Sequence, residues 1–165
     1  MKYIIGISAF YYESSVALLE DGVVKEFLKE ESFTRIKGTN TFPKLSLNFL
    51  KKKYSLSSKN IGACVFYEKP LLSWSRMTYY SMQKPLLRWK INSQQFKNIW
   101  KNGLLFDNSI KNIFNLNSSQ ILFANHHVSH ALTSTIYENY FRNDLNKDKL
   151  IIVVDGVGDG ETLSI

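Results

Sequence analysis

An α/β fold is predicted by the way strand-like and helix-like patterns follow one another along the 165 residues of this chain. Three short apolar runs open the sequence, and Asp21-Gly22 between the second and the third is a strong hairpin signal. Further strand-like runs at 61–67, 119–124 and 150–154 are separated by segments whose apolar residues recur at helical spacing. The length and the apolar content suffice for one packed domain.

The first half of the chain is expected to form a meander of strands, a helix and a fourth strand. Residues 29–43 are polar and predict a loop, after which Phe42-Pro43 leads into a helix with an apolar stripe. Three lysines, Lys51 to Lys53, lie in the last turn of that helix, where they favour its dipole. The predicted strands of this half span 2–7, 16–19, 23–28 and 61–67.

A basic and aromatic segment, residues 71–117, follows the fourth strand. It carries seven basic residues against one acidic residue, which accounts for +6 of the net charge of +7. Its aromatic residues fall at helical spacing, and this favours an amphipathic helical insertion that packs its rings and turns its lysines to water. Basic side chains interleaved with rings also occur in proteins that bind single-stranded nucleic acid, and this is the alternative interpretation.

All three histidines of the chain fall in one helix that is predicted to begin after Asn125. Asn is a good N-cap residue, and 126–140 contains neither Gly nor Pro. Residues four apart share a helix face, so His126 and His130 can chelate one transition metal. Residues three apart also approach one another, so His127 with His130 is a rival pair. No Glu follows His126, and the metalloprotease signature is therefore absent.

Asp155 is the predicted third ligand of this metal site. It comes directly after 150–154, a run expected to form a buried strand, and a glycine turn follows it. A carboxylate at the C-terminal end of such a strand faces the crevice where α/β folds bind ligands. The competing interpretation is that Asp-Gly here makes an ordinary turn.

An anion such as a phosphate group is expected to bind near this carboxylate. Gly156 and Gly158 let backbone N–H groups approach an anion, because no Cβ stands in the way. The loop after the first strand is rich in hydroxyl groups, and Ser8, Ser14 and Ser15 with local amides are suited to hold a phosphate. We therefore predict Ser8, Gly156 and Gly158 as cofactor-binding residues.

Cys64 is the single cysteine, so the chain has no disulfide framework, and a reducing cytoplasm is the predicted location. We expect its side chain to be buried and not nucleophilic, because no flanking base or cation activates it. The apolar run at the N-terminus is too short for a signal peptide, and no segment approaches membrane-spanning length. No membrane partner is expected.

The order of the predicted elements is that of a ribonuclease-H-like half-domain of the actin/sugar-kinase type with a helical insertion. Three segments, at 5–22, 30–43 and 65–71, resemble the N-terminal domain of the O-carbamoyltransferases, which carbamoylate nodulation factors and antibiotics. A fourth, His126-His127-Val128-Ser129-His130-Ala131 with Val154 to Gly158, resembles the metal site of that family. The resemblance covers nearly the whole chain, and the motifs occur in the family order.

The resemblance implies an actin-like domain similar to the threonylcarbamoyl-transferring subunit of tRNA modification. It implies an iron-type divalent metal held by His126, His130, Asp155 and a further aspartate later in the chain. It also implies transfer of carbamoyl from carbamoyl-adenylate to a substrate hydroxyl. In that family the adenylate is made from carbamoyl phosphate and ATP in a separate C-terminal domain.

Two departures from the family pattern shape the expectation for this chain. Tyr12-Glu13 stands where the family usually has His-Asp, and the family's proteins are several times longer. Residues 1–165 are therefore expected to be an N-terminal lobe, incomplete at its C-terminus and inactive without a complementing chain. The alternatives are a non-catalytic nucleotide- or metal-binding module of the same fold, and a nucleic-acid-binding protein that uses 71–117.

Overall fold

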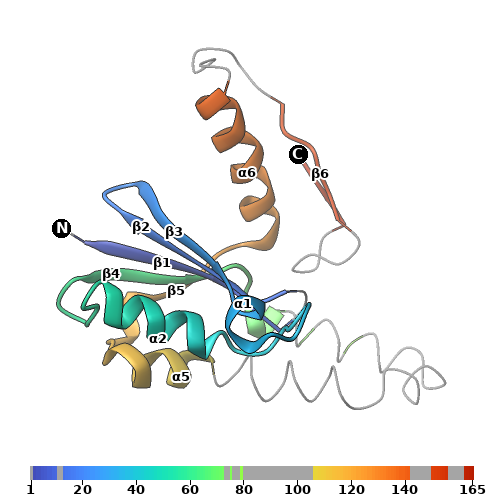
Figure 1. Ribbon diagram of the computed structural model, residues 1–165. Coiled ribbons are helices and arrows are strands. Elements are labelled where there is room, and N and C mark those ends of the chain that lie inside the picture. Colours follow the sequence, from blue (N-terminus) through green and yellow to red (C-terminus); the bar gives the residue numbers. More distant parts are fainter. Residues whose placement is uncertain are drawn as a thin grey trace.

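A mixed five-stranded sheet forms the centre of the molecule in the computed structural model (Figure 1). Its strands are β1 (Tyr3–Ser8), β2 (Ser15–Glu20), β3 (Val23–Lys29), β4 (Ile61–Phe66) and β5 (Ile121–Phe123). They lie in the order β3-β2-β1-β4-β5. The β1–β2 and β2–β3 pairs are antiparallel, whereas β1–β4 and β4–β5 are parallel. This mixed sheet with its helices confirms the predicted α/β class.

The structure describes residues 2–10, 13–72, 75, 79, 106–141, 150–155 and 162–165, with only the backbone described for 137–141. Among these, the predicted hairpin is confirmed. Asp21 and Gly22 form a two-residue connection between β2 and β3 with φ angles of 49° and 83°. Positive φ at both central positions is typical of the type I′ turn, whose twist matches that of the flanking strands.

The loop predicted for residues 29–43 is wrong in part, because it contains the short helix α1 (Glu31–Thr34). The backbone N–H groups of Phe33 and Thr34 donate to the carbonyl oxygen of Glu30 at 3.0 Å each. Arg35 then ends the helix with a left-handed φ of 61°. No apolar period marks so short a helix, so the sequence gives little sign of it.

The following helix, α2 (Lys44–Lys53), is confirmed, and its start depends on a residue outside it. The Glu30 side chain is buried, with its residue only 2% exposed. Its carboxylate accepts hydrogen bonds from the backbone N–H groups of Leu45 and Ser46, both at 2.9 Å, and from the Ser46 hydroxyl at 2.5 Å. Glu30 therefore satisfies donors at the N-terminus of α2 that have no partner inside the helix.

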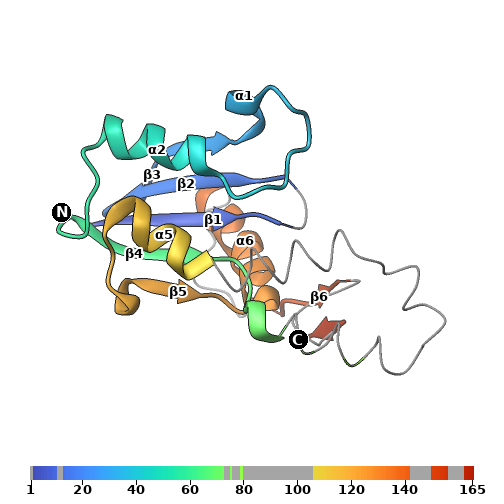
Figure 2. The same ribbon diagram turned by 90° about the horizontal axis from the view of Figure 1, so that it is seen from below.

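The core lies between the sheet and two helices, α2 and α5 (Phe106–Phe114), which cover the same face of the sheet (Figure 2). Phe106, Ile110 and Phe114 are spaced four apart, and all three are buried. The ring of Phe66, from β4, packs on Phe106 with centroids 4.4 Å apart. Aromatic pairs of this kind add to the area that they bury.

Helix α5 is the described end of the basic aromatic segment at 71–117. Its rings pack inward, and Lys111 pairs with Asp107 one turn earlier on the helix surface. Of the remaining part, the structure describes only Leu71, Leu72, Ser75 and Tyr79 before residue 106, so most of the predicted helical insertion lies outside the described residues. No helix in the described parts of the chain is long and apolar enough to cross a membrane.

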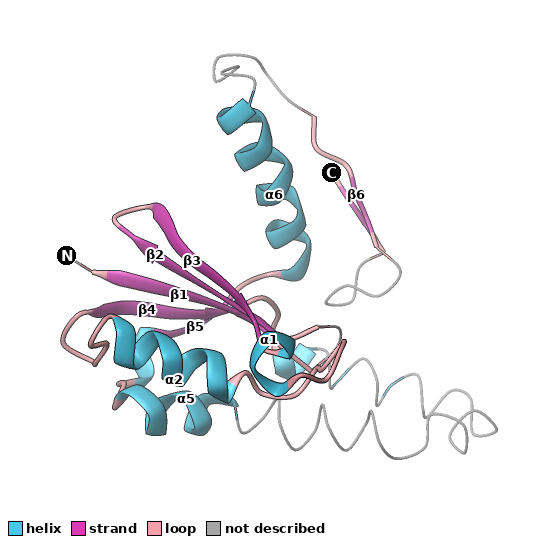
Figure 3. Cartoon of the chain, viewed as in Figure 1, coloured by secondary structure: helices cyan, strands magenta, loops and turns pink. Residues whose placement is uncertain are grey.

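The third part of the fold is a long helix with a two-stranded ribbon beside it (Figures 1 and 3). After the short 3-10 helix η2 (Ser118–Gln120) and β5, the chain enters α6 (His126–Phe141), as predicted. α6 lies on the side of the sheet away from α2 and α5. The ribbon consists of β6 (Val153–Val154) and β7 (Leu163–Ser164), which pair antiparallel.

The prediction of a buried strand over 150–154 is wrong in its length and in its burial. Only Val153 and Val154 pair, and their described partner is β7, not the five-stranded sheet. Val153 is 8% exposed, whereas Ile152 and Val154 on either side are 56% and 75% exposed. This alternation shows a strand with one covered face, because successive side chains of a strand point to opposite faces.

Candidate metal centre

Helix α6 begins at the carboxyl ends of two parallel strands. The backbone N–H of Ala124 donates to the carbonyl oxygen of Phe66 at 2.8 Å, which ties the exit of β5 to the end of β4. Asn125 is the N-cap residue, as predicted, since its Oδ1 accepts from the backbone N–H of Val128 at 3.2 Å. The start of α6, whose first two turns carry the histidines, is thereby fixed at the carboxyl ends of these strands, where α/β folds bind ligands.

The structure brings His126, His130 and Asp155 together. The Nε2 atom of His126 lies 2.8 Å from the Asp155 Oδ2 atom and 3.1 Å from the His130 Nε2 atom. The third distance, from His130 Nε2 to Asp155 Oδ2, is 3.8 Å. One possible ligand atom from each residue lies within 4.8 Å of the others. The helical pair and the strand-end carboxylate therefore converge on one point.

This geometry fits a divalent transition metal. Ligand bonds of about 2.0–2.2 Å place neighbouring donor atoms of a tetrahedral site roughly 3.3 Å apart. The two shorter distances of the cluster, at 2.8 and 3.1 Å, are close to that value, and the third at 3.8 Å is somewhat longer. The side chains are 14%, 28% and 55% exposed for His126, Asp155 and His130 respectively, so solvent or a substrate could reach a metal held by these residues.

His127 does not join this cluster. It is 4% exposed, and its Nδ1 atom lies 2.6 Å from the Oγ atom of Ser164 in β7. The four-residue pair His126 and His130 is therefore the pair that shares a face with Asp155. The spacing of the histidines allows both pairs, and only the position of the ribbon distinguishes them.

The loop after β4 supports the first turn of α6. The ring of Tyr67 packs against the imidazole of His126 with centroids 5.7 Å apart. The Ser129 hydroxyl lies 3.4 Å from the carbonyl oxygen of Tyr67 and 3.0 Å from that of Asn125. Tyr67 thus restricts the orientation of one predicted ligand, a role for which the sequence carries no spacing signal.

The assignment of Ser8, Gly156 and Gly158 as anion-binding residues stays a prediction. Gly156 and Gly158 lie outside the described residues. Ser8 ends β1, where it pairs with Ser15, and it is not in the cluster of His126, His130 and Asp155. Ser14 is buried, and its hydroxyl donates to the carbonyl oxygen of Thr41, so this hydroxyl holds two loops together.

The first loop also contains the departure from the family pattern. Tyr12 lies outside the described residues, whereas Glu13 is exposed and pairs with Lys29 at 2.5 Å. The hydrogen bond and charge of Lys29 lower the pKa of Glu13 below its usual value. Glu13 therefore stays ionised and is engaged with the end of β3.

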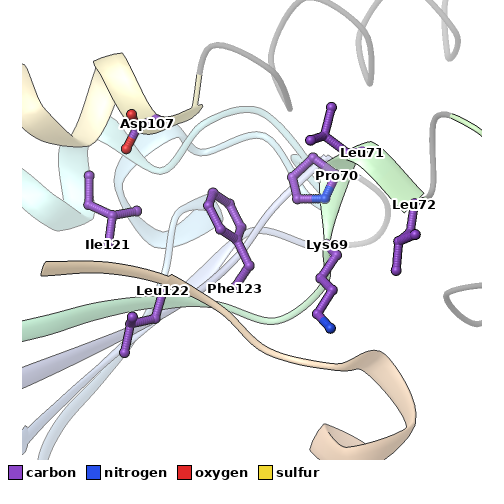
Figure 4. A pocket seen from close by; sticks show the side chains of 8 residues that line it. All are labelled: Lys69, Pro70, Leu71, Leu72, Asp107, Ile121, Leu122 and Phe123. Atoms are coloured by element: carbon purple, nitrogen blue, oxygen red, sulfur yellow. The ribbon is translucent and has the colours of Figure 1, made fainter. Parts of the chain in front are cut away.

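A pocket of roughly 820 Å³ lies beside β5, on the edge of the sheet (Figure 4). Sequence reasoning did not anticipate it, because its walls come from segments far apart in the chain. Most of the described lining is apolar, with one ammonium and one carboxylate. The described residues that line it are Lys69, Pro70, Leu71, Leu72, Asp107, Ile121, Leu122 and Phe123.

Cys64 has the inert character that its sequence context predicts. It is buried in β4, and burial raises the pKa of its thiol to about 12. A thiol with this pKa carries almost no thiolate at neutral pH, and the thiolate is the reactive form. Cys64 is therefore a packing residue of the sheet.

Comparisons with known proteins agree with the resemblance. The family described as "Carbamoyltransferase N-terminus" matches residues 3–165. Uncharacterized protein sll1178 of Synechocystis is 32% identical over 177 aligned positions, covering 100% of this chain and 27% of the relative. Nodulation protein NolNO of Sinorhizobium fredii is 26% identical over 162 positions, covering 92% of this chain and 20% of the relative. The chain thus spans about a quarter or less of these relatives, and it belongs to the carbamoyltransferase N-terminus family.

Proposed function

We propose that this chain is the N-terminal part of a metal-dependent carbamoyltransferase and that His126, His130 and Asp155 hold its metal. Membership of the family supports carbamoyl transfer in general. The observation that carries the finer proposal is the convergence of two imidazoles and one carboxylate from two separate elements. The proposed donor is carbamoyl-adenylate, made from carbamoyl phosphate and ATP, and the proposed acceptor is a hydroxyl group.

The donor set supports an iron-type metal. Two histidine nitrogens and one carboxylate oxygen with open positions are typical of non-haem iron(II) sites, and the same donors also suit zinc. When bound, such a metal supplies a Lewis acid that polarises a phosphate or carbonyl oxygen. The exposure of His130, at 55% of its side chain, leaves room beside the cluster for a nucleotide substrate.

The strand order supports a ribonuclease-H-like lobe of the actin type. An antiparallel meander of three strands, extended by parallel β4 and β5, gives the order β3-β2-β1-β4-β5. In this arrangement the carboxyl ends of β1, β4 and β5 lie at the same end of the sheet, and α6 starts from that end. We propose that the nucleotide approaches the cluster from this end of the sheet.

The proposed activity belongs to a longer assembly. The two relatives extend well beyond the matched segment, since this chain covers 27% and 20% of their lengths. We therefore propose that a polypeptide equivalent to their remaining part completes the enzyme and supplies the carbamoyl-adenylate. The acceptor alcohol, carbamoyl phosphate and ATP are its proposed small-molecule partners.

Metal analysis of the purified chain tests the site. The wild type is expected to bind one Fe²⁺ or Co²⁺ per chain, and His126→Ala or Asp155→Asn is expected to abolish binding. Asp107→Asn is the matched control, because it removes a carboxylate that pairs with Lys111 outside the cluster. Equal metal content in the wild type and His126→Ala would contradict the proposed site.

A transfer assay tests the reaction. Carbamoyl phosphate with a labelled carbon, ATP and a panel of alcohols would be incubated with the chain and with the remaining part of the sll1178 relative. Labelled carbamate is expected only when both are present and only with an intact cluster. Transfer that persists in His126→Ala would separate the activity from the metal site.

A further inference from the structure

The buried histidine of α6 has a partner that no ligand role explains. His127 is 4% exposed, and its Nδ1 atom lies 2.6 Å from the Ser164 hydroxyl, 37 residues away in the chain. Consecutive residues of a helix are turned by about 100°, since 3.6 residues make a turn. His127 therefore points toward the ribbon from a different direction than His126 and His130.

The pairing of the ribbon links this contact to Asp155. Ser164 is paired with Val153, so the two side chains point to the same face of the ribbon. Asp155 lies two positions after Val153 and points to that face as well, because side chains alternate along a strand. Its backbone N–H donates to the carbonyl oxygen of Thr162 at 3.0 Å, which continues the ladder to this residue.

One face of the ribbon thus carries both the residue that contacts His127 and the residue that meets the histidine pair. The opposite face is open, since Val154 and Leu163, which are paired with each other, are 75% and 55% exposed. A slip of the ribbon by one residue would turn Asp155 to the open face. An isolated two-stranded ribbon is only marginally stable, so its position depends on what it packs against.

We propose that His127 is a positioning residue for the metal centre: by bonding Ser164 it holds the ribbon on α6 in the register that turns Asp155 toward His126 and His130. This inference rests on the proposed metal site and explains why three histidines occur together where two suffice. Two of them face the ion, and the third fixes the element that delivers the carboxylate.

Three variants separate positioning from ligation. His127→Asn keeps a polar atom near the place of Nδ1, so it can still bond Ser164, but it lacks the imidazole that binds metals well. His127→Leu removes the bond and keeps an apolar side chain of useful size for this buried site. Ser164→Ala removes the same bond from the other side, and Ser134→Ala, on the exposed part of α6, is its control.

Titration of the full chain with Co²⁺ alone, followed by its visible absorption, measures the effect. Loss of a residue that orients a metal ligand typically weakens metal binding by about 10- to 100-fold. We expect a loss of this size for His127→Leu and Ser164→Ala, the same absorption spectrum at saturation, and near wild-type binding for His127→Asn. The double variant with both His127→Leu and Ser164→Ala should bind Co²⁺ no more weakly than His127→Leu, since the two substitutions remove the same hydrogen bond.

Two results of this titration would overturn the proposal while leaving the metal site in place. If His127→Asn lost Co²⁺ as completely as His126→Ala, His127 would be a ligand. If His127→Leu bound Co²⁺ as the wild type does, the bond to Ser164 would have no positioning role.

Hydrogen exchange of the metal-free protein gives a readout independent of the ion. Amides of 150–155 should exchange faster in His127→Leu than in the wild type or His127→Asn, whereas those of β1 should be unchanged. If the wild type bound no Co²⁺, the proposed function would fail on that result. The exchange data alone would then decide whether the contact between His127 and Ser164 holds the ribbon on α6. Equal exchange in all three proteins would overturn it.

Discussion

Glu30 offers the most direct test of how this fold is held together. Its buried carboxylate accepts three hydrogen bonds at the start of α2, from two backbone N–H groups and the Ser46 hydroxyl. The substitution Glu30→Gln keeps the size of the side chain. It replaces one acceptor oxygen by an NH₂ group, which must then face Leu45 N–H or the two donors of Ser46, donor against donor.

The expected cost follows from these contacts. A hydrogen bond to a charged group contributes about 1.5–3 kcal/mol, and a donor left unsatisfied in a buried site costs about 1–3 kcal/mol. Loss of the charge at the helix N-terminus adds roughly 0.3–1 kcal/mol. The total is about 3–5 kcal/mol once the bond that the remaining oxygen still accepts is allowed for. At about 2–4 °C per kcal/mol for a chain of this size, the midpoint should fall by roughly 6–20 °C.

Thermal and urea unfolding followed by circular dichroism at 222 nm measure this change. Glu13→Gln is the matched control, because it makes the same chemical change at an exposed ion pair with Lys29. Exposed pairs contribute little, so the control should unfold close to the wild type. A Glu30→Gln protein with a midpoint as high as the control would refute the assignment of Glu30 as the cap of α2.

Three further predictions concern titration, reactivity and metal. Hydrogen bonds from Lys53 and Tyr54 lower the pKa of Glu26 in the folded protein. The contribution of Glu26 to stability is therefore present above the unfolded pKa near 4.5 and is lost as the pH falls through the lower folded pKa. Urea midpoints between pH 7 and 3 should fall less in Glu26→Gln than in the wild type. Equal slopes of urea midpoint against pH in the two proteins would contradict this. Cys64, with a pKa of about 12, should resist labelling by maleimide at pH 7.5 in the native protein and react at once in denaturant. Complete labelling of the native protein would show that the Cys64 side chain in β4 is accessible to solvent. If the cluster binds a divalent metal, a chelator should lower the thermal midpoint of the metal-loaded wild type and leave that of His130→Ala unchanged; an equal shift in both would place the metal elsewhere.

Local signals in the sequence predict those parts of the fold whose contacts are local. Asp21-Gly22 predicts its hairpin because the turn type depends on these two residues alone. Asn125 predicts the start of α6 for the same reason, since the cap bond spans three residues. Helical spacing likewise predicts that His130 shares a face with an earlier histidine, although it allows both His126 and His127 as the partner.

The parts that could not be predicted depend on residues far apart in the chain. Glu30 caps a helix that begins 14 residues later, and no sequence spacing announces such a bond. The choice between His126 and His127 as the partner of His130 depends on where the ribbon packs, and its contacts with these two histidines span 29 and 37 residues. The short length of β6 depends on its neighbour β7, and an apolar run alone does not show which neighbour a strand has.

The two sides of the β6–β7 ribbon differ in what they contact. Its inner side carries Asp155 and Ser164, and substitutions of these two residues would alter the contacts with His126 and His127. Its outer side exposes the apolar residues Ile152, Val154, Leu163 and Ile165 to water. Apolar area of this kind favours association with any polypeptide that can shield it. Residues that alternate along this ribbon thus govern two different properties, the tendency of the chain to associate and the geometry of its histidine cluster. Substitutions on one side of the ribbon can change one property in evolution while the other is preserved.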